Sequence, residues 1–343
     1  MRWGPLAACI LAACGHTEFI VFSAPEDNAI YQVKAPSPGA SYDPAEVGAA
    51  VSLVARSDSI GKPMGVAIGN DIVNGNSYLY IADEENLAIW RYKVKVGWSS
   101  GVSTEGPPVK VVQNVGKPRW VAVDPNGNLY FTDVETNRVL KMTSSAISKG
   151  DAAGVETIYD GSVVTQVSAP GGIAADSFFV AWGNQAADAA RGAVVRGLRK
   201  PKKQDTADRA LSVLTIASNA NKVEGLCFAG DSVYFADSQG DLFAVNKKGG
   251  AITAVFPQSE HGLQSPRGCS RSEDGTLFWA DFGGDKIFSM PASTAHPQPL
   301  QQVSLVASLG TDQKPFGLVV VSSGQRYTML LAWYAMLLFS CGA

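Results

Sequence analysis

Residues 116–142 read GKPRWVAVDPNGNLYFTDVETNRVLKM, and this stretch decides the fold because its parts recur through most of the chain. A Lys-Pro pair leads into an alternating run over 120–123, and Asn126-Gly127 predicts a tight hairpin turn with positive φ angles. A second strand over 129–132 ends at Asp133, and a third begins near Val139. The stretch therefore predicts consecutive antiparallel strands.

Six copies of the motif that begins this stretch occur, here called start motifs: Lys62-Pro63-Met64-Gly65, Lys117-Pro118-Arg119-Trp120, Ala169-Pro170-Gly171-Gly172, Lys222-Val223-Glu224-Gly225, Ser265-Pro266-Arg267-Gly268 and Lys314-Pro315-Phe316-Gly317. Successive copies are 55, 52, 53, 43 and 49 residues apart, a period that suits four short strands and their turns. Five copies are followed by a second strand with a polar end, at Asp83, Asp133, Asn184, Asp237 and Asp281.

The sixth start motif has no such strand after it, but three strand-like segments precede the first motif, at 19–24, 29–33 and 50–54. Pairing these with the last inner strand would close a ring and remove its open edges. The apolar period is that of strands, which disfavours a helical solenoid. We therefore expect an all-β protein, a six-bladed β-propeller with four-stranded blades and a composite closing blade.

The opening EFIVFSAPEDNAIYQVK, residues 18–34, and the second strands LYIAD, LYFTD, VYFAD and LFWAD resemble the six-bladed propellers of the YWTD (LDL-receptor class B) and NHL-repeat type. The resemblance covers about residues 18–321. It implies that the second-strand Asp residues mainly tie adjacent blades together rather than bind a ligand. Pro25 and Gly183-Asn184 depart from the pattern, which puts the regular inter-blade Asp contacts in question in two blades.

Composition favours an exported globular domain. With 46% hydrophobic and 17% charged residues in 343, one propeller can use nearly the whole chain, and a net charge of −3 gives no nucleic-acid signature. Arg2 precedes an apolar run over 6–14, so we predict a signal peptide over 1–15 rather than a cytosolic start. The protein would then be extracytoplasmic, either secreted or membrane-anchored. Leu11-Ala12-Ala13-Cys14 also resembles a bacterial lipobox, in which Cys14 would be lipidated.

The propeller would occupy residues 16–321, followed by a hydrophobic C-terminal tail over 322–343. Within the tail, residues 327–339 form a largely apolar run that is too short to span a bilayer as a helix. Three alternatives stay open for it: membrane association, an extra strand packed on the composite blade, or a sequence-prediction artefact.

Two cysteines fall in the propeller, Cys227 and Cys269. They stand one position out of register on the inner strands of adjacent blades, so we expect buried, unpaired thiols rather than a disulfide.

A basic stretch joins the outer strands of the third blade and includes Arg196, Arg199, Lys200, Lys202 and Lys203. We expect an exposed loop here. A solvated loop is the simpler interpretation, and contact with anionic lipid or an acidic partner is the alternative.

The third residue of each start motif should surround one mouth of the central channel, which makes Met64, Arg119, Glu224, Arg267 and Phe316 the candidate ligand-binding residues. Arg119 and Arg267 are three blades apart, so we expect them to face each other across the mouth with Glu224 beside Arg267. Two guanidinium groups could hold a carboxylate or phosphate. A network of ion pairs at the rim is the structural alternative.

Familiar catalytic motifs are absent from the sequence, and only three histidines, His16, His261 and His296, could serve as bases. The leading hypothesis is a recognition module without a cofactor, which binds a protein or a small anionic ligand at the channel face. The alternative is a metal-dependent hydrolase similar to the gluconolactonase-type propellers. It would need Ca²⁺ or another divalent cation, with Glu224 as a ligand.

Overall fold

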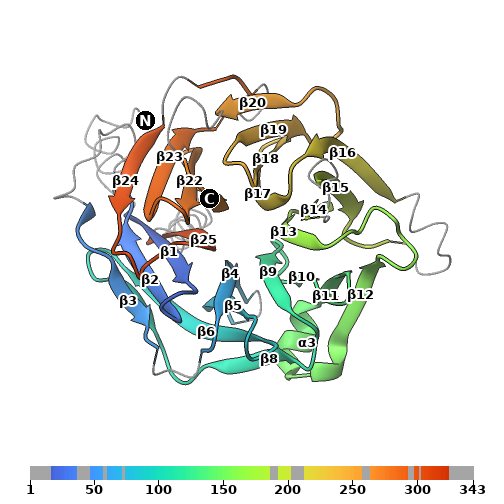
Figure 1. The fold of residues 1–343 in the computed structure, drawn as a ribbon. Helices are drawn as coiled ribbons and strands as arrows, with labels where there is room; N and C mark the ends of the chain where they lie inside the picture. The colour runs from blue at the N-terminus through green and yellow to red at the C-terminus, as the bar shows by residue number, and fades with distance from the viewer. Residues whose placement is uncertain are drawn as a thin grey trace, which may run out of the picture.

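The computed structural model describes residues 17–36, 47–56, 60–71, 74–185, 192–201, 212–256, 263–292, 297–300 and 303–323. These residues form six antiparallel sheets arranged as the blades of a ring (Figure 1). The predicted all-β propeller is therefore confirmed. The leader, most of the tail, Lys202, Lys203 and the three histidines lie outside the described residues.

The composite blade joins the two ends of the chain, as expected. Its order is β25-β1-β2-β3, and β1 pairs with β25 from Glu18 opposite Ser322 to Phe22 opposite Leu318. The strands are β1 (Glu18–Ala24), β2 (Ala29–Lys34), β3 (Val51–Val54) and β25 (Leu318–Ser322).

The other five blades follow in chain order, and each starts at the channel. Blade 1 contains β4 (Pro63–Asn70), β5 (Ser77–Asp83), β6 (Ala88–Gly97), β7 (Gly101–Thr104) and β8 (Val109–Gln113). Blade 2 contains β9 (Pro118–Val123), β10 (Leu129–Asp133), β11 (Arg138–Met142) and β12 (Val155–Asp160). Blade 3 contains β13 (Pro170–Ala175), β14 (Phe179–Asn184), β15 (Gly192–Leu198) and β16 (Val213–Ala220). Blade 4 contains β17 (Val223–Ala229), β18 (Ser232–Asp237), β19 (Leu242–Asn246) and β20 (Thr253–Phe256). Blade 5 contains β21 (Pro266–Arg271), β22 (Thr276–Asp281), β23 (Lys286–Pro291) and β24 (Ser304–Ser308).

Two features depart from a uniform four-stranded pattern. In blade 1, β7 and β8 pair with successive parts of the ten-residue strand β6, so two short strands share one outer edge. Blade 2 inserts a short helix, α3 (Ser144–Lys149), and a 3₁₀ turn, η1 (Ala152–Gly154), between β11 and β12. The side chain of Thr143 accepts from the Ala146 amide at the start of α3.

The hairpin turn that the Asn126-Gly127 pair predicts is present, but in a different form. Only Gly127 has a positive φ, of 75°. The Gly127 amide donates to the Asp124 carbonyl, while the Asp124 carboxylate accepts from the amides of Asn126 and Asn128. The expectation of two positive φ angles was wrong because the Asp124 side chain organises a longer turn, in which a single glycine takes the left-handed conformation.

Apolar side chains on neighbouring blades pack against each other and form the core. The largest cluster runs across blades 1 to 3 and includes Tyr130, Phe131, Tyr159 and Trp182, all fully buried. The turns between the strands form the two faces of the disc. We call the face where the inner strands begin the motif face, and the opposite face the terminal face.

Candidate functional site

The start motifs distort the inner strands where they meet the motif face. Register shifts occur between Pro63 and Val66, Pro170 and Ile173, Val223 and Leu226, and Pro266 and Cys269, and opposite Asp133 in blade 2. In blades 1, 3, 4 and 5 the third and fourth residues of the motif therefore leave the regular ladder, whereas in blade 2 only Arg119 does, because Trp120 stays opposite Thr132. Bulges of this kind re-aim side chains, and here they place the variable third residue at the channel mouth.

Glycine at the fourth position of the motif lets adjacent inner strands approach closely. A Cβ at Gly225 would lie 1.7 Å from the carbonyl oxygen of Arg267, and a Cβ at Gly317 would lie 2.5 Å from that of Met64. Blade 2 alone carries another residue, Trp120, at this position. The next start motif has glycine at its third and fourth positions, Gly171 and Gly172. No side chain at these positions competes with the indole of Trp120 for space.

Trp120 packs with Met64 and Phe316 in a buried apolar group, here called the apolar plug. The rings of Trp120 and Phe316 stack with centroids 4.9 Å apart, although they come from blade 2 and the composite blade. All three side chains are buried and belong to the core cluster. Met64 and Phe316, predicted to line a ligand site, are each 3% exposed, and a binding role for them stays a prediction.

Arg119 lies over this plug. Its guanidinium carbon is 5.4 Å from the centre of the Phe316 ring, and its Nη1 is 3.8 Å from a carboxylate oxygen of Glu84. Both charged side chains are mostly covered, at 24% and 17% exposure. The pair is long for a charge-assisted hydrogen bond.

Arg267 makes a tighter pair with Glu224, as predicted, with Nη1 2.5 Å from the carboxylate. The other oxygen of Glu224 accepts from the amide of Gln185 at 2.5 Å. The Arg267 guanidinium also lies 5.9 Å from the centre of the Phe282 ring, and Phe282 meets Phe316 edge to face at 6.1 Å. The two arginines therefore flank one continuous pair of aromatic rings.

Some donors in this cluster have no acceptor. The buried Nε atoms of Arg119 and Arg267 make no hydrogen bond to the protein. A buried donor without an acceptor costs about 1–3 kcal/mol, and more when it is charged. Oε2 of Glu84 is also buried and has no hydrogen-bond donor, so the cluster holds an unsatisfied acceptor as well as unsatisfied donors.

Three members of the site, Glu84, Gln185 and Phe282, did not appear among the candidates from sequence. They share one position, directly after the polar residue that ends a second strand. Each donates its backbone amide to the first residue of the start motif of its own blade, at Lys62, Ala169 and Ser265. The repeat itself indicated this position, because the residue after the polar end of the second strand makes the same hydrogen bond in every complete blade.

The second-strand carboxylates are structural. Asp83 accepts from the amides of Gly61 and Lys62 and from Asn86 and Trp90. Burial alone would raise the pKa of Asp83, but its hydrogen bonds outweigh burial and lower the pKa. Asp133 and Asp281 accept from the corresponding amides, 116 and 117, and 264 and 265.

Blade 3 keeps the same connection despite its different sequence. Asn184 accepts from the amide of Ser168 and donates to the carbonyl of Gln166. In the composite blade, Ser23 makes a contact between blades, donating to the Met64 carbonyl as Thr132 donates to that of Gly171. In blade 3 an amide therefore replaces the carboxylate. In the composite blade Ser23 stands at the position of Thr132 and Ala24 at that of Asp133, so this blade keeps the hydroxyl contact between blades and lacks the carboxylate.

The basic stretch is only partly a loop. Arg196 lies on β15, donates to the Lys247 carbonyl at 2.9 Å and covers the Phe179 ring at 4.1 Å. Arg199 pairs with the buried carboxylate of Asp124. The expectation of an exposed loop was wrong for these two arginines, because each meets partners from another blade. Lys200 is exposed.

Cys227 and Cys269 form a disulfide with their Cα atoms 5.8 Å apart, so the expectation of unpaired thiols was wrong. The bulges and the close contact of Gly225 with Arg267 stagger β17 against β21. This stagger compensates for the offset of one position in the sequence. The bond joins blades 4 and 5 a few residues from Glu224 and Arg267.

The residues present do not fit a metal site at Glu224. Its two oxygens face a guanidinium and an amide, and the nearby positive charge would repel a cation. Within the described ranges, no three His, Cys, Asp or Glu side chains cluster as metal ligands.

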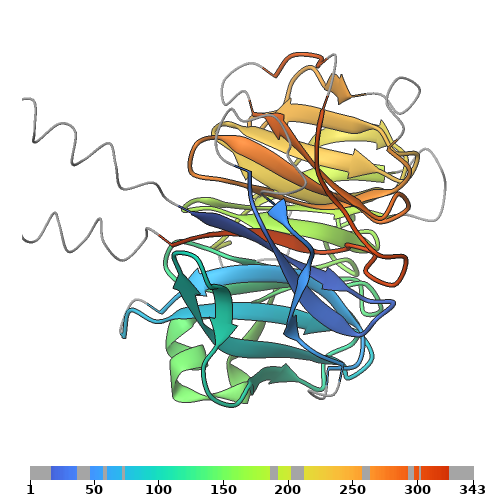
Figure 2. The ribbon, with the colours of Figure 1, turned by 90° about the vertical axis from the view of Figure 1, so that its left-hand side faces the viewer.

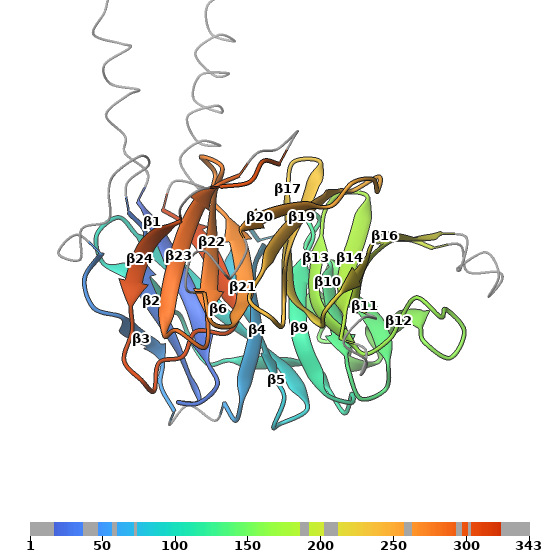
Figure 3. The same ribbon diagram turned by 45° about the horizontal axis from the view of Figure 1, so that its top comes forward.

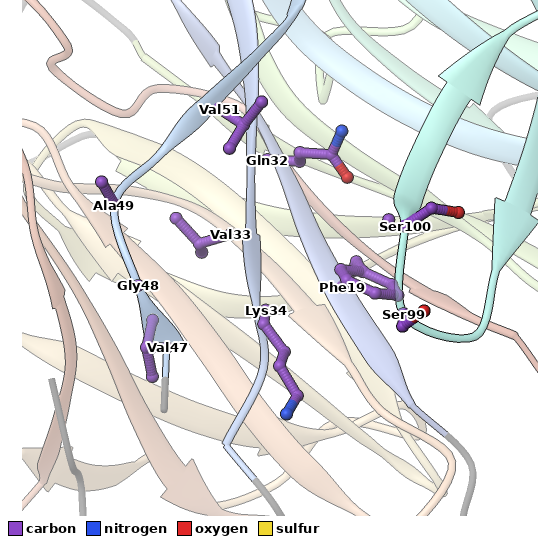
Figure 4. A pocket seen from close by; sticks show the side chains of 11 residues that line it. Phe19, Gln32, Val33, Lys34, Val47, Gly48, Ala49, Val51, Ser99 and Ser100 are labelled. Carbon is purple, nitrogen blue, oxygen red and sulfur yellow. The ribbon is translucent and has the colours of Figure 1, made fainter. Parts of the chain in front are cut away.

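Two cavities lie away from the channel. One, of about 270 Å³, is bordered by Phe19, Gln32, Lys34 and the turn at Ser99 and Ser100, between the composite blade and blade 1 (Figure 4). The amide of Gln32 is satisfied there by both backbone groups of Val102, at 2.6 Å. The other, of about 280 Å³, lies between β8 and α3.

Comparisons with known proteins agree with the fold. No protein-family model matches the chain, and no curated protein sequence matches it significantly. Among solved structures it is similar to a gluconolactonase from Xanthomonas campestris, with 10% identity, a TM-score of 0.50, and 89% of this chain and 88% of that chain covered. It is also similar to a virginiamycin B lyase from Staphylococcus aureus, with 14% identity, a TM-score of 0.48, and 74% and 73% coverage. A luciferin-regenerating enzyme shows 15% identity, a TM-score of 0.48, and 71% and 76% coverage. At such identities these likenesses concern the propeller fold alone.

Proposed function

We propose that the protein is a recognition module that binds a carboxylate or phosphate group of a protein or small-molecule ligand on the motif face, between Arg119 and Arg267. The observation that carries the proposal is the pair of buried Nε donors without acceptors, one on each side of the Phe282 and Phe316 rings. Acceptor oxygens of a ligand would satisfy them. The aromatic plug beneath would hold a flat apolar group next to the anion.

The carboxylates that face the two arginines offset their positive charge, so the site would select among anionic ligands rather than bind any anion. Glu84 and Glu224 each face one arginine, so a single charge on a ligand must compete with an existing pair. The longer Arg119–Glu84 pair, at 3.8 Å, should yield first. A ligand that combines one anionic group with an aromatic or aliphatic body suits this arrangement better than a bare inorganic ion.

Export stays part of the proposal and gains support from the disulfide. Disulfides persist in oxidising compartments and are rare in the cytosol, and Cys227–Cys269 joins two blades.

The test compares binding by the double variant R119Q/R267Q with that of the wild type. The probes are benzoate, phenyl phosphate and inorganic phosphate, with titration calorimetry as the readout. We expect the wild type to prefer the aromatic anions and the variant to lose at least tenfold in affinity. The control K117Q/K222Q removes two exposed charges from the same face and should bind normally. Equal affinity in both double variants would reject the site.

A calcium arm examines the hydrolase alternative. The wild type and Glu224→Gln are melted with and without calcium, and each is incubated with a simple lactone. We expect no calcium-dependent stabilisation, because Glu224 is paired with Arg267. A Glu224-dependent rise in melting temperature together with lactone hydrolysis would favour the alternative.

A further inference from the structure

Both ends of the described chain leave the terminal face. β1 begins at Glu18 and β25 ends at Ser322, and these two residues are paired. Both strands run between the two faces, so Glu18 and Ser322 lie at the end farthest from the start motifs (Figures 2 and 3). Any segment joined to the propeller before residue 17 or after residue 323 connects to it on this face.

Exposed apolar side chains are concentrated on the same face. Nine large apolar residues are exposed among those the structure describes, and six lie in or beside turns of the terminal face: Val51, Trp98, Phe178, Leu198, Leu214 and Ile252. Leu87 and Val163 lie on the motif face. Phe178, at the tip of the β13–β14 hairpin, is 72% exposed, and Trp98, in the β6–β7 turn, is 47% exposed.

Positive charge accompanies the apolar residues over blades 3 and 4. Lys200 follows Leu198 by two residues, and Lys248 precedes Ile252 in the β19–β20 turn; both lysines are exposed. The carboxylates of Asp124 and Asp176 in this region are already paired with Arg199 and Lys247. Asp231, in the β17–β18 turn, is an exposed carboxylate of the same region, so the two exposed lysines leave a small excess of positive charge near Phe178.

We propose that the terminal face rests on an anionic lipid bilayer, with Phe178 and Trp98 in the interfacial region and Lys200 and Lys248 against the headgroups. The apolar residues come from blades 1, 3 and 4 and the composite blade, and so are spread around one face of a disc. Such a distribution suits a flat apolar surface better than a compact protein partner. Aromatic side chains favour the interface, and lysines favour anionic lipid.

The sequence on either side supports a bilayer as the occupant. Cys14, which the lipobox resemblance would lipidate, lies three residues before Thr17, and the apolar run 327–339 begins four residues after Ser323. If either contacts lipid, these short connections hold the terminal face close to it. The site at Arg119 and Arg267 would then point away from the membrane.

The test places an environment-sensitive fluorophore on each face of the full chain. Cys9, Cys14 and Cys341 are replaced by Ser, and F178C or L87C supplies the thiol for labelling with an NBD dye. Vesicles of phosphatidylcholine with phosphatidylglycerol are then added. We expect a blue shift and at least a twofold rise in emission at position 178, and no change at 87. The difference between the two labelled positions reports which face of the propeller lies against the bilayer, however strongly the flanking segments bind lipid.

Equal changes at the two positions, or no change at 178, would overturn the proposal. A second arm compares K200S/K248S with K117S/K222S, two lysine pairs on opposite faces. The first should weaken the partition onto anionic vesicles about fivefold or more, because each lysine near the surface contributes to attraction, and the second should not. An identical partition in the two variants would count against the headgroup contacts.

Discussion

At the scale of single residues, Trp120 shows how one substitution in a repeat changes the site. Glycine is required at the equivalent positions in the other start motifs because the next inner strand lies against them. Where Gly171-Gly172 follows, the indole reaches Phe316 and stacks on its ring. The recognition that we propose on the motif face would take place above these aromatic rings.

The disulfide should contribute measurably to stability. We expect C227S/C269S to lower the free energy of unfolding by about 2–4 kcal/mol, because the bond restricts the unfolded chain. Urea unfolding followed by tryptophan fluorescence gives the midpoint. Reductant should lower the wild-type midpoint toward that of the variant and leave the variant unchanged. A midpoint equal in all four conditions would show that the bond does not form.

Asp124 should make stability depend on pH in the acid range. Burial alone would raise its pKa, but hydrogen bonds from Asn128, Arg199 and Tyr130 lower the pKa below the ordinary value of 3.8. Its contribution is therefore present above pH 3.8 and is lost as the pH falls through the lower pKa of the folded state. We expect Asp124→Asn to cost about 3 kcal/mol at pH 7, because it leaves Arg199 without its carboxylate.

Urea midpoints of the wild type and Asp124→Asn between pH 7 and pH 2.5 give the comparison, and the difference should shrink at the acid end. Asp231→Asn, which removes an exposed carboxylate, should change stability by less than about 0.5 kcal/mol at any pH. A constant difference for Asp124→Asn would contradict the assignment.

At the scale of elements, β25 is the strand on which closure depends. It contributes the inner edge of a blade whose other three strands come from the N-terminal end. The Ser23 hydroxyl accepts from the Gly317 amide within this blade and donates to the Met64 carbonyl, which connects the blade with blade 1. Loss of β25 would expose the edge of β1, its neighbour in the sheet, and the side of β21 that packs against β25.

Truncation after Gln313 should therefore abolish cooperative folding, because open edges invite aggregation. Truncation after Arg326, which removes only the apolar part of the tail, should leave a soluble propeller with a nearly unchanged melting temperature. Calorimetry and size-exclusion chromatography distinguish the two. A monomeric, cooperatively melting protein that lacks β25 would refute closure by this strand.

At the scale of the whole molecule, the two faces have different compositions. The motif face holds the charged and aromatic cluster around Arg119 and Arg267, and the terminal face holds six of the exposed apolar side chains and both described ends. Within the described part of the chain, no helix is both long and apolar enough to cross a membrane.

The sequence by itself determined the ring. Blade number, strand order and the composite closure follow from start motifs about fifty residues apart and from strands with a period of two, and such signals are local. The ends of the second strands were also readable in the five complete blades, because an Asp, or the Asn at 184, marks each of them.

Only the tertiary structure decided which residues meet at the channel. Trp120 and Phe316 are far apart in sequence, as are Arg119 and Glu84 in their separate blades, and their contacts depend on how far each inner strand is shifted against the next. The same shift, set by backbone packing against glycine, brought Cys227 and Cys269 together despite their mismatched positions. Contacts between blades depend on how far neighbouring inner strands are shifted along each other, to within a single residue. The spacing of the start motifs varies from blade to blade and does not specify that shift.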